Sequence, residues 1–194
     1  MNHNIFLCGV GGQGTVLASK LLAAAAMKKS IPVMSAETIG MAQKGGSVFS
    51  HLRLGDGLSC PMLGSGTADI LIGFEPAEAV RSLHYLKPEG CVIVNSHPIL
   101  PVTAVLKGSS YTGKEMIDYL RKTVKHLAVI DCEAACNEIG SSKVMNMVLL
   151  GAAIRTGAIG ISMDDIKAVM REKVRPQFVE RNEKALDYVK GLSF

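Results

Sequence analysis

Short apolar runs alternate with longer amphipathic stretches over about the first 140 residues of the chain. Several of these runs are apolar without interruption, as expected for strands buried on both faces of a sheet. The stretch Thr15–Lys29 is rich in Ala and Leu and has no helix breaker, so it predicts a helix between the first two runs. The runs that predict strands are Asn4–Cys8, Ile31–Ser35, Ser47–Leu54, Thr67–Phe74, Cys91–Asn95 and Leu127–Asp131.

A strand, a helix and a second strand follow one another at the start of the chain, which predicts a βαβ unit and a parallel sheet. Asp56-Gly57 is a turn signal, so Leu58–Met62 is expected to return beside Ser47–Leu54 as a β-hairpin. Pro76–Leu86 predicts a helix with proline in its first turn. The predicted fold class is therefore α/β, with a Rossmann-like, mostly parallel sheet and a β-hairpin insertion.

The pattern becomes helical after about residue 140, and Ser162 and Asp165 have the spacing of a capping box. We expect one domain over residues 1–194, with an α/β sheet core to about residue 140 and a C-terminal helical segment packed on it. The apolar face of residues 144–154 fits either the core or a partner protein. The predicted helices of this segment are Ser141–Thr156, Asp164–Val174 and Gln177–Lys190.

Composition narrows the class of protein further. The 194 residues are 48% hydrophobic and 20% charged, which excludes a disordered chain. The net charge of +4 is small and dispersed, so we expect no nucleic-acid partner. No apolar run reaches the ~20 residues of a membrane-spanning helix, so we expect no membrane partner either. The five cysteines are odd in number and follow no signal peptide, which favours a reducing, cytoplasmic location.

The spacing of the cysteines does not suggest a metal site. No Cys-x-x-Cys pair is present, so the usual zinc and iron–sulfur spacings are missing. Cys132 and Cys136 would share one helical face, and we interpret them as free thiols. Gly55-Asp56-Gly57 resembles the start of a magnesium–thiamine diphosphate motif, but no asparagine follows at the required distance. We therefore predict no metal and no thiamine in this chain.

A first glycine segment follows the first predicted strand and precedes the first predicted helix. Glycines at this place let the backbone turn tightly and approach a ligand, and the open N–H groups of the helix start attract anions. Glu37 follows the second predicted strand, roughly where a dinucleotide-binding fold has its ribose-binding acid. Nucleotide binding and simple helix–strand packing both fit this pattern. The candidate cofactor-binding residues are Gly9, Gly11, Gly12, Gln13 and Gly14.

A second glycine segment lies between the second and third predicted strands and is the most distinctive part of the chain. It combines an acid, an amide, a base and a Gly–Gly pair, a mixture suited to contact with a phosphate, a substrate or another subunit. His51 and Arg53 share one face of the strand that follows and could support this loop. A plain structural turn is the alternative. The candidates for a partner interface or substrate site are Glu37, Gln43, Lys44, Gly45, Gly46, Ser47, His51 and Arg53.

These motifs, taken together and in order, resemble the gamma-type subunit of 2-oxoacid:ferredoxin oxidoreductases, most closely the beta subunit of the indolepyruvate type. The resemblance covers nearly the whole chain. One departure is Lys44, where the family usually has arginine before its Gly–Gly pair. The matching segments are Gly9-Val-Gly-Gly-Gln-Gly14, Glu37-x-x-Gly40-Met-Ala-Gln-Lys-Gly-Gly-Ser-Val48, Ala68-Asp69-x-Leu71-x-Gly73-x-Glu75 and Lys143-Val-x-Asn146-Met-Val-Leu-Leu-Gly151.

The resemblance implies a subunit that completes a shared active site. Such complexes oxidatively decarboxylate a 2-oxoacid to an acyl-coenzyme A and pass electrons to ferredoxin. Thiamine diphosphate and [4Fe–4S] clusters are then expected in a larger partner subunit, with coenzyme A as the acyl acceptor and no firmly bound cofactor in this chain. The isolated chain is expected to be inactive, and no catalytic side chain is assigned. The first glycine segment would face a phosphate of coenzyme A.

Two other functions remain open at this point. The first glycine segment also fits a self-contained Rossmann-type oxidoreductase that uses NAD(P) or a flavin. A nucleotide-sensing regulatory module is a third interpretation. Binding of these molecules by the isolated chain distinguishes both from a subunit that needs a partner.

Overall fold

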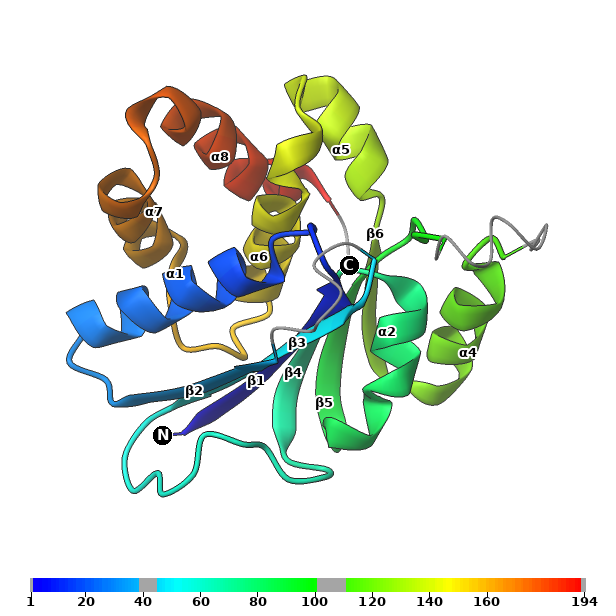
Figure 1. Cartoon of the computed structure of the whole chain (residues 1–194), viewed down its shortest axis with the longest axis horizontal. Helices are drawn as coiled ribbons and strands as arrows, with labels where there is room; N and C mark the ends of the chain where they lie inside the picture. The colour runs from blue at the N-terminus through cyan, green and yellow to red at the C-terminus, as the bar shows by residue number, and fades with distance from the viewer. Residues whose placement is uncertain (1, 39–44, 101–110, 193–194) are drawn as a thin grey trace.

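A computed structural model describes residues 2–38, 45–100 and 111–192 (Figure 1). Within these ranges six strands form one sheet in the order β2-β3-β1-β4-β5-β6. Four neighbouring strands, β1, β4, β5 and β6, are parallel, and β3 is antiparallel to β1 and to β2. The predicted mostly parallel sheet is thus confirmed. The strands are β1 His3–Val10, β2 Val33–Thr38, β3 Ser47–Leu54, β4 Ala68–Gly73, β5 Leu86–Asn95 and β6 His126–Ile130.

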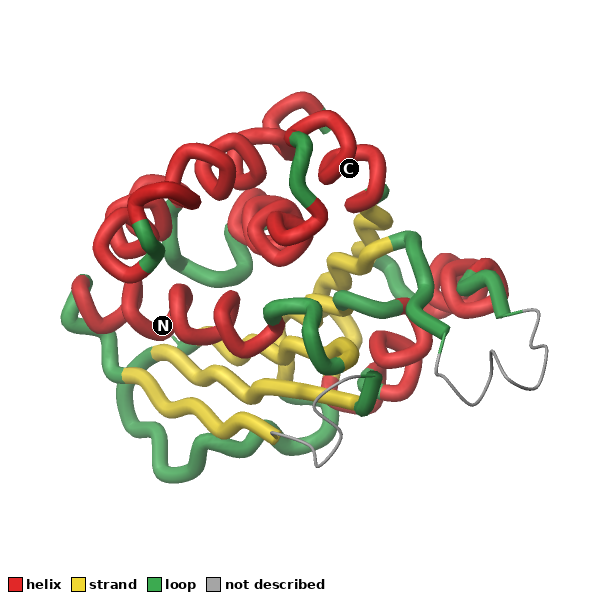
Figure 2. The backbone as a smooth tube through the Cα atoms, turned by 45° about the horizontal axis from the view of Figure 1, so that its top comes forward, coloured by secondary structure: helices red, strands yellow, loops and turns green. Residues whose placement is uncertain are grey.

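Helices cover both faces of the sheet, which gives three layers (Figure 2). Helices α1 (Thr15–Lys28), α5 (Cys132–Ile139), α6 (Met145–Arg155), α7 (Met163–Lys173) and α8 (Pro176–Tyr188) contribute to the larger core on one face. Helices α2 (Pro76–Arg81) and α4 (Lys114–Thr123) pack into a smaller core on the other face. Three short 3-10 turns are described: η1 Leu83–Tyr85, η2 Ser142–Val144 and η3 Val189–Gly191.

The β-hairpin prediction was wrong in its second arm. Strand β3 pairs with β2 and β1, and Leu58–Met62 forms no strand. Pro61 lacks an N–H group for a ladder, and the Arg53 guanidinium donates to the Cys60 carbonyl oxygen at 2.8 Å, which holds this segment as a loop. Strand β2 runs in the same direction as β1, as the βαβ pattern predicted, but β3 lies between them and is antiparallel to both.

Several element boundaries also differ from the prediction. Strand β2 begins and ends later than Ile31–Ser35, so Glu37 lies in the strand, paired with Ser50. The helix expected over Pro76–Leu86 ends at Arg81, and the following strand already begins at Leu86. Helix α4 was not predicted, although Met116, Ile117 and Leu120 have the spacing of one helical face. The expected helix Ser141–Thr156 is divided into η2 and α6.

The C-terminal helices share the main core with the sheet. Every residue of α6 from Asn146 to Ile154 is buried, so the apolar face of this helix packs inside the chain. Helix α7 begins with the predicted capping box, in which the Ser162 hydroxyl and the Asp165 carboxylate each accept a backbone N–H of the other. Pro176 occupies the first turn of α8, as predicted. These helices fix the position of α6 against the start of α1.

Candidate functional site at the carboxyl edge of the sheet

The chain connections change from one face of the sheet to the other between the neighbouring strands β1 and β4. The chain leaves β1 toward α1 on one face, and it leaves β4 toward α2 on the other face. In open α/β sheets, ligands bind in the crevice at the carboxyl ends of the strands where this reversal occurs. The first glycine segment and the described end of the second, Gly45–Ser47, lie at this edge, where a ligand is expected.

Gln13 fills the inside of the first glycine segment. Its Oε1 accepts the Val10 N–H at 2.7 Å, and its Nε2 donates to the Phe74 carbonyl oxygen at 2.8 Å. A Cβ atom on Gly9 would lie 2.6 Å from Oε1, so glycine is required there. Gln13 thereby ties the end of β1 to the end of β4. Its side chain occupies the space beside the Gly9 backbone, which a Rossmann dehydrogenase leaves open for its dinucleotide.

The start of α1 leaves N–H groups available beyond Gln13. The N-cap residue Gly14 has φ +83°, a value that favours glycine, and no side chain caps the helix. The first turn holds no acidic residue that could neutralise the positive end of the helix dipole. Gly12, with φ +100°, is the open tip of the loop. This end of α1 therefore keeps an uncompensated positive end, and anion binding there stays a prediction.

The described end of the second glycine segment, Gly45–Ser47, lies against the first segment. The Gly11 N–H donates to the Gly46 carbonyl oxygen at 2.9 Å, which continues the ladder of β1 and β3. The Ser47 hydroxyl donates to the Glu78 Oε2 at 2.7 Å and so connects this segment to α2. Gln43 and Lys44 lie outside the described residues, while Gly45 and Gly46 continue into β3.

A buried polar cluster that sequence reasoning missed supports the same edge. Glu75 is 2% exposed, and its Oε2 accepts the Glu78 N–H at 2.9 Å, which caps α2. Its Oε1 accepts the Tyr111 hydroxyl at 2.8 Å. Burial, and then the hydrogen bond to Glu75, raise the pKa of Tyr111 above its usual range. An acid directly before Pro76 was the available signal, since it is a typical N-cap position.

His51 and Arg53 hold a different loop from the one expected. His51 is 1% exposed, and its Nδ1 accepts the Leu63 N–H at 3.1 Å. Burial lowers the pKa of His51, so the ring stays neutral, and the rings of Phe6 and Tyr85 pack edge-on against it. Arg53 donates to the Asn4 side chain and to the Cys60 carbonyl oxygen. The hydrogen bonds to Leu63 and Cys60 both reach the segment that follows β3. His51 and Arg53 therefore hold that segment in place.

A cavity of about 480 Å³ opens beside Gln13 at this edge. Asn95, the last residue of β5, donates from Nδ2 to the carbonyl oxygens of Phe74 at 3.3 Å and His97 at 3.1 Å. Burial raises the pKa values of the Cys132 and Cys136 thiols, which keeps them protonated near neutral pH. The residues that line this cavity include Gln13, Asn95, Cys132, Cys136, Ser141, Ser142 and Met145.

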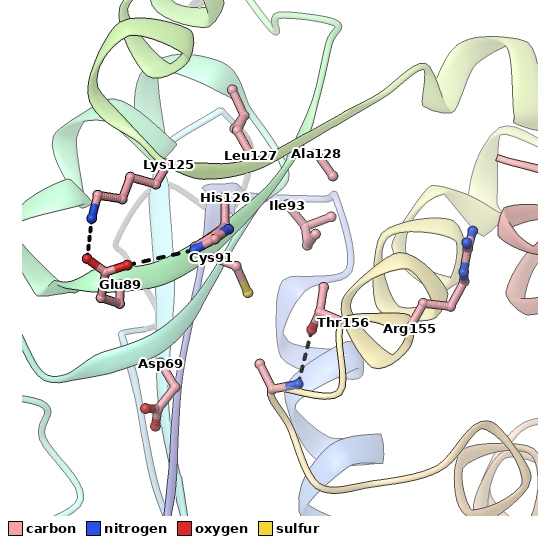
Figure 3. A pocket seen from close by; sticks show the side chains of 11 residues that line it. Asp69, Glu89, Cys91, Ile93, Lys125, His126, Leu127, Ala128, Arg155 and Thr156 are labelled. Atoms are coloured by element: carbon pink, nitrogen blue, oxygen red, sulfur yellow. Dashed lines mark hydrogen bonds and ion pairs between the residues drawn. The ribbon is translucent and has the colours of Figure 1, made fainter. Parts of the chain in front are cut away.

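A second cavity, of about 550 Å³, lies at the opposite, amino edge of the sheet (Figure 3). Cys91 and His126 are register partners at this end of β5 and β6. Lys125 pairs with Glu89, and Asp69 pairs with Lys87. Burial raises the pKa of the Cys91 thiol. This cavity is separated from both glycine segments by the length of the sheet.

In the described part of the chain, no group of three or more His, Cys, Asp and Glu side chains could hold a metal ion. No described helix has the length and apolar character needed to cross a membrane.

Comparison with known proteins agrees with this geometry. The chain is 38% identical over 188 residues to the indolepyruvate oxidoreductase subunit IorB of Pyrococcus horikoshii, covering 95% of this chain and 93% of that subunit. The fold matches the keto/oxoacid ferredoxin oxidoreductase gamma subunit from Geobacter sulfurreducens, with TM-score 0.68, 22% identity and coverage of 95% and 94%. It also matches 2-oxoglutarate:ferredoxin oxidoreductase from Magnetococcus marinus, with TM-score 0.73 and 20% identity, over 99% of this chain and 32% of that one.

Both glycine segments, the Gln13 contact and the C-terminal helices lie within residues 4–190, the range that matches the family described as pyruvate ferredoxin/flavodoxin oxidoreductase. A family match over this range, together with a relative of 38% identity along nearly the full length of both chains, leaves one conclusion. This chain belongs to the pyruvate ferredoxin/flavodoxin oxidoreductase family.

Proposed function

We propose that this chain is the non-cofactor subunit of a 2-oxoacid:ferredoxin oxidoreductase of the indolepyruvate type. The assembled enzyme oxidatively decarboxylates an arylpyruvate, transfers the acyl group to coenzyme A and passes the two electrons to ferredoxin. The observation that carries the proposal is the 38% identity to an indolepyruvate oxidoreductase subunit over 95% of the chain.

The cysteines of this chain indicate which subunit binds the cofactors. The buried thiols Cys8, Cys132 and Cys136 have raised pKa values and make no cluster-binding set in the described ranges. We therefore assign the thiamine diphosphate and the [4Fe–4S] clusters to a larger partner subunit. Thiamine diphosphate supplies decarboxylation when bound there, and this chain shapes the adjoining surface.

The carboxyl edge of the sheet is the surface proposed to meet the partner. Gln13 makes this edge rigid by joining the ends of β1 and β4, and Ser47 joins the second glycine segment to α2 through Glu78. The open N–H groups at the start of α1 then face an anionic part of coenzyme A. Leu17 and Ile99 are exposed apolar side chains near the same edge, at 42% and 40%, and they suit a subunit contact.

A reducing, cytoplasmic location is part of the proposal. All five cysteines are free thiols, and three of them are buried. Free thiols without disulfides are typical of proteins in a reducing compartment.

An anaerobic pull-down of the tagged chain from its own host tests the function. We expect co-purification with a larger protein that contains iron, sulfide and thiamine diphosphate. The complex should reduce ferredoxin with an arylpyruvate and coenzyme A, and the chain alone should not. Saturable binding of NAD(P) or a flavin with full turnover by the isolated chain would overturn the proposal. Failure to capture any such partner in repeated pull-downs would count against it equally.

A further inference from the structure

The start of helix α2 holds two buried carboxylates, Glu75 and Glu78, which are 2% and 5% exposed. Burial of a charged group is costly unless partners stabilise it. Glu75 accepts the Glu78 N–H and so caps the helix, and Glu78 pairs with Arg81, whose side chain is 64% exposed. A shorter aspartate, asparagine or serine before Pro76 would cap α2 equally well. Capping alone therefore does not account for two buried acids at this place.

Each carboxylate also reaches a segment that is distant in sequence. The Glu78 Oε2 accepts the Ser47 hydroxyl at 2.7 Å, and the Glu75 Oε1 accepts the Tyr111 hydroxyl at 2.8 Å. Ser47 is the exposed first residue of β3, so water would otherwise solvate its hydroxyl. A hydrogen bond to a charged carboxylate is about twice as strong as one between neutral groups. Glu78 therefore fixes a residue that burial does not hold in place.

Helix α2 is itself held closely against the end of β4. A Cβ atom on Gly73 would lie 2.6 Å from the Ala79 Cβ, so the strand and the helix approach as closely as a glycine allows. The carbonyl oxygen of the next residue, Phe74, accepts the Gln13 side chain at 2.8 Å. Glu78 is thus carried by an element whose position is fixed by packing.

The connection continues from Ser47 to both glycine segments. The carbonyl oxygen of Gly46 accepts the Gly11 N–H at 2.9 Å. Gly45 and Gly46 have no side chains that could fix their backbone, and glycine is the most permissive residue in conformation. The side chain that holds the described end of this segment is therefore that of Ser47. Loss of its bond to Glu78 releases the segment and weakens the contact with Gly11.

We propose that Glu78 is a positioning residue of the assembled enzyme. It acts through Ser47 to hold Gly45–Ser47, the described end of the second glycine segment, in the orientation needed for turnover. Glu78 is buried, so it acts through this segment and not by contact with a substrate. The effect on turnover rests on the proposed function, which places the carboxyl edge beside the partner's active site. The effect on the segment itself does not depend on that function.

Hydrogen exchange in the isolated full chain tests the effect on the segment. Ser47→Ala removes the hydroxyl and should make the Gly11 N–H exchange about tenfold faster, and Glu78→Gln, which removes the charge of the acceptor, should do so severalfold. Ser47→Thr keeps a hydroxyl and should keep nearly native exchange. Thr67→Ala is the matched control, because it removes a hydroxyl that donates to the Gly64 carbonyl oxygen, also at 2.7 Å, at the opposite edge. It should leave the Gly11 N–H unaffected.

Steady-state kinetics of the assembled enzyme test the effect on turnover. Ser47→Ala and Glu78→Gln should each lower kcat about tenfold and leave the KM for the 2-oxoacid nearly unchanged, since a misplaced group slows the reaction without weakening substrate binding. Ser47→Thr should restore most of the kcat, and Thr67→Ala should not change it. The variant with both substitutions should lose no more than the larger single loss, because both changes break the same hydrogen bond.

Three results would overturn the inference. They are native Gly11 exchange in Ser47→Ala, native kcat in both Ser47→Ala and Glu78→Gln even if their melting temperatures fall, and additive losses of kcat in the double variant. Failure of the proposed function is distinguishable from these results. If the native chain forms no complex that turns over a 2-oxoacid, the proposed function fails, and the Gly11 exchange still decides whether Glu78 and Ser47 hold the segment.

Discussion

The two cavities at opposite edges of the sheet differ in how their polar groups are satisfied. At the amino edge, Lys125 and Glu89 form an ion pair in which both side chains are about two-thirds exposed, at 65% and 67%. At the carboxyl edge the amides of Gln13 and Asn95 are buried and donate to backbone carbonyl oxygens, beside the more exposed pair of His97 and Glu133. Exposed ion pairs are solvated and contribute little to folding stability. Buried polar groups that still have an unpaired donor or acceptor are instead typical of a binding site. The comparison explains why the larger cavity is not the better functional candidate.

Replacement of glycine by alanine should separate the two edges most strongly. Gly14 at the carboxyl edge and Gly66 before β4 at the amino edge both have positive φ values, +83° and +67°. Gly14→Ala adds a clash with Asn146 to the backbone strain, while a Cβ atom on Gly66 meets nothing within 4 Å. We expect a loss of about 3 kcal/mol in the free energy of unfolding for Gly14→Ala, and about 1 kcal/mol for Gly66→Ala.

Urea denaturation of the two alanine variants measures this difference. Gly12→Ala is an internal control, because Gly12 shares the loop of Gly14 but has open space around it. Equal losses at positions 12, 14 and 66 would mean that strain alone matters and that Asn146 is not pressed against the start of α1.

A second contrast between the two edges is the effect of pH on folding stability, which differs between the buried thiol of Cys8 and the exposed thiol of Cys60. Burial raises the pKa of Cys8 from 9.0 to about 12, with the neighbouring carboxylates Glu78 and Glu75 adding to the effect. Between these values the unfolded chain releases the proton and the folded chain keeps it, so stability falls as pH rises. The slope is about 1.4 kcal/mol per pH unit for one group.

Denaturation midpoints between pH 9 and pH 11 check this linkage. Cys8→Ala should flatten the decline of stability with pH relative to the native chain. The matched variant Cys60→Ala removes an exposed thiol from the loop at the amino edge and should keep the native slope. A Cys8→Ala slope that equals the native one would show that the thiol ionises as readily in the folded chain.

The sequence predicted features that depend on neighbours along the chain. Uninterrupted apolar runs located the central strands, and the Ser162–Asp165 spacing located the start of α7, because each pattern is set by local geometry. The order of β2 and β3, the Tyr111–Glu75 hydrogen bond and the Gly14–Asn146 contact were not predicted. Each joins residues far apart in sequence, so only tertiary packing determines it.

The site itself shows the same limit. The glycine motif located the first segment, and the Gly11–Gly46 hydrogen bond shows that both segments share one edge. No sequence pattern indicated that Gln13 would fill the loop. A glutamine amide in a glycine turn can bind either the loop backbone or a ligand, and the sequence does not distinguish the two. His51 was a candidate because it shares a strand face with Arg53 beside the second glycine segment. Its hydrogen bond to Leu63 was not predicted, since it depends on the loop that takes the place of the expected strand Leu58–Met62.

The smallest effect is expected at the amino edge, where Lys125→Ala removes one partner of the Glu89 ion pair. Both side chains face solvent, so water replaces the lost interaction and the melting temperature should not change measurably. Glu89 also has His126 within 3.8 Å, which leaves the carboxylate a second partner. Thermal melting at low and high salt measures this, with Lys184→Ala on α8 as a matched exposed pair. A clear, salt-dependent loss at Lys125 but not at Lys184 would show that the amino-edge cavity is electrostatically organised, and the contrast between the two edges would then fail.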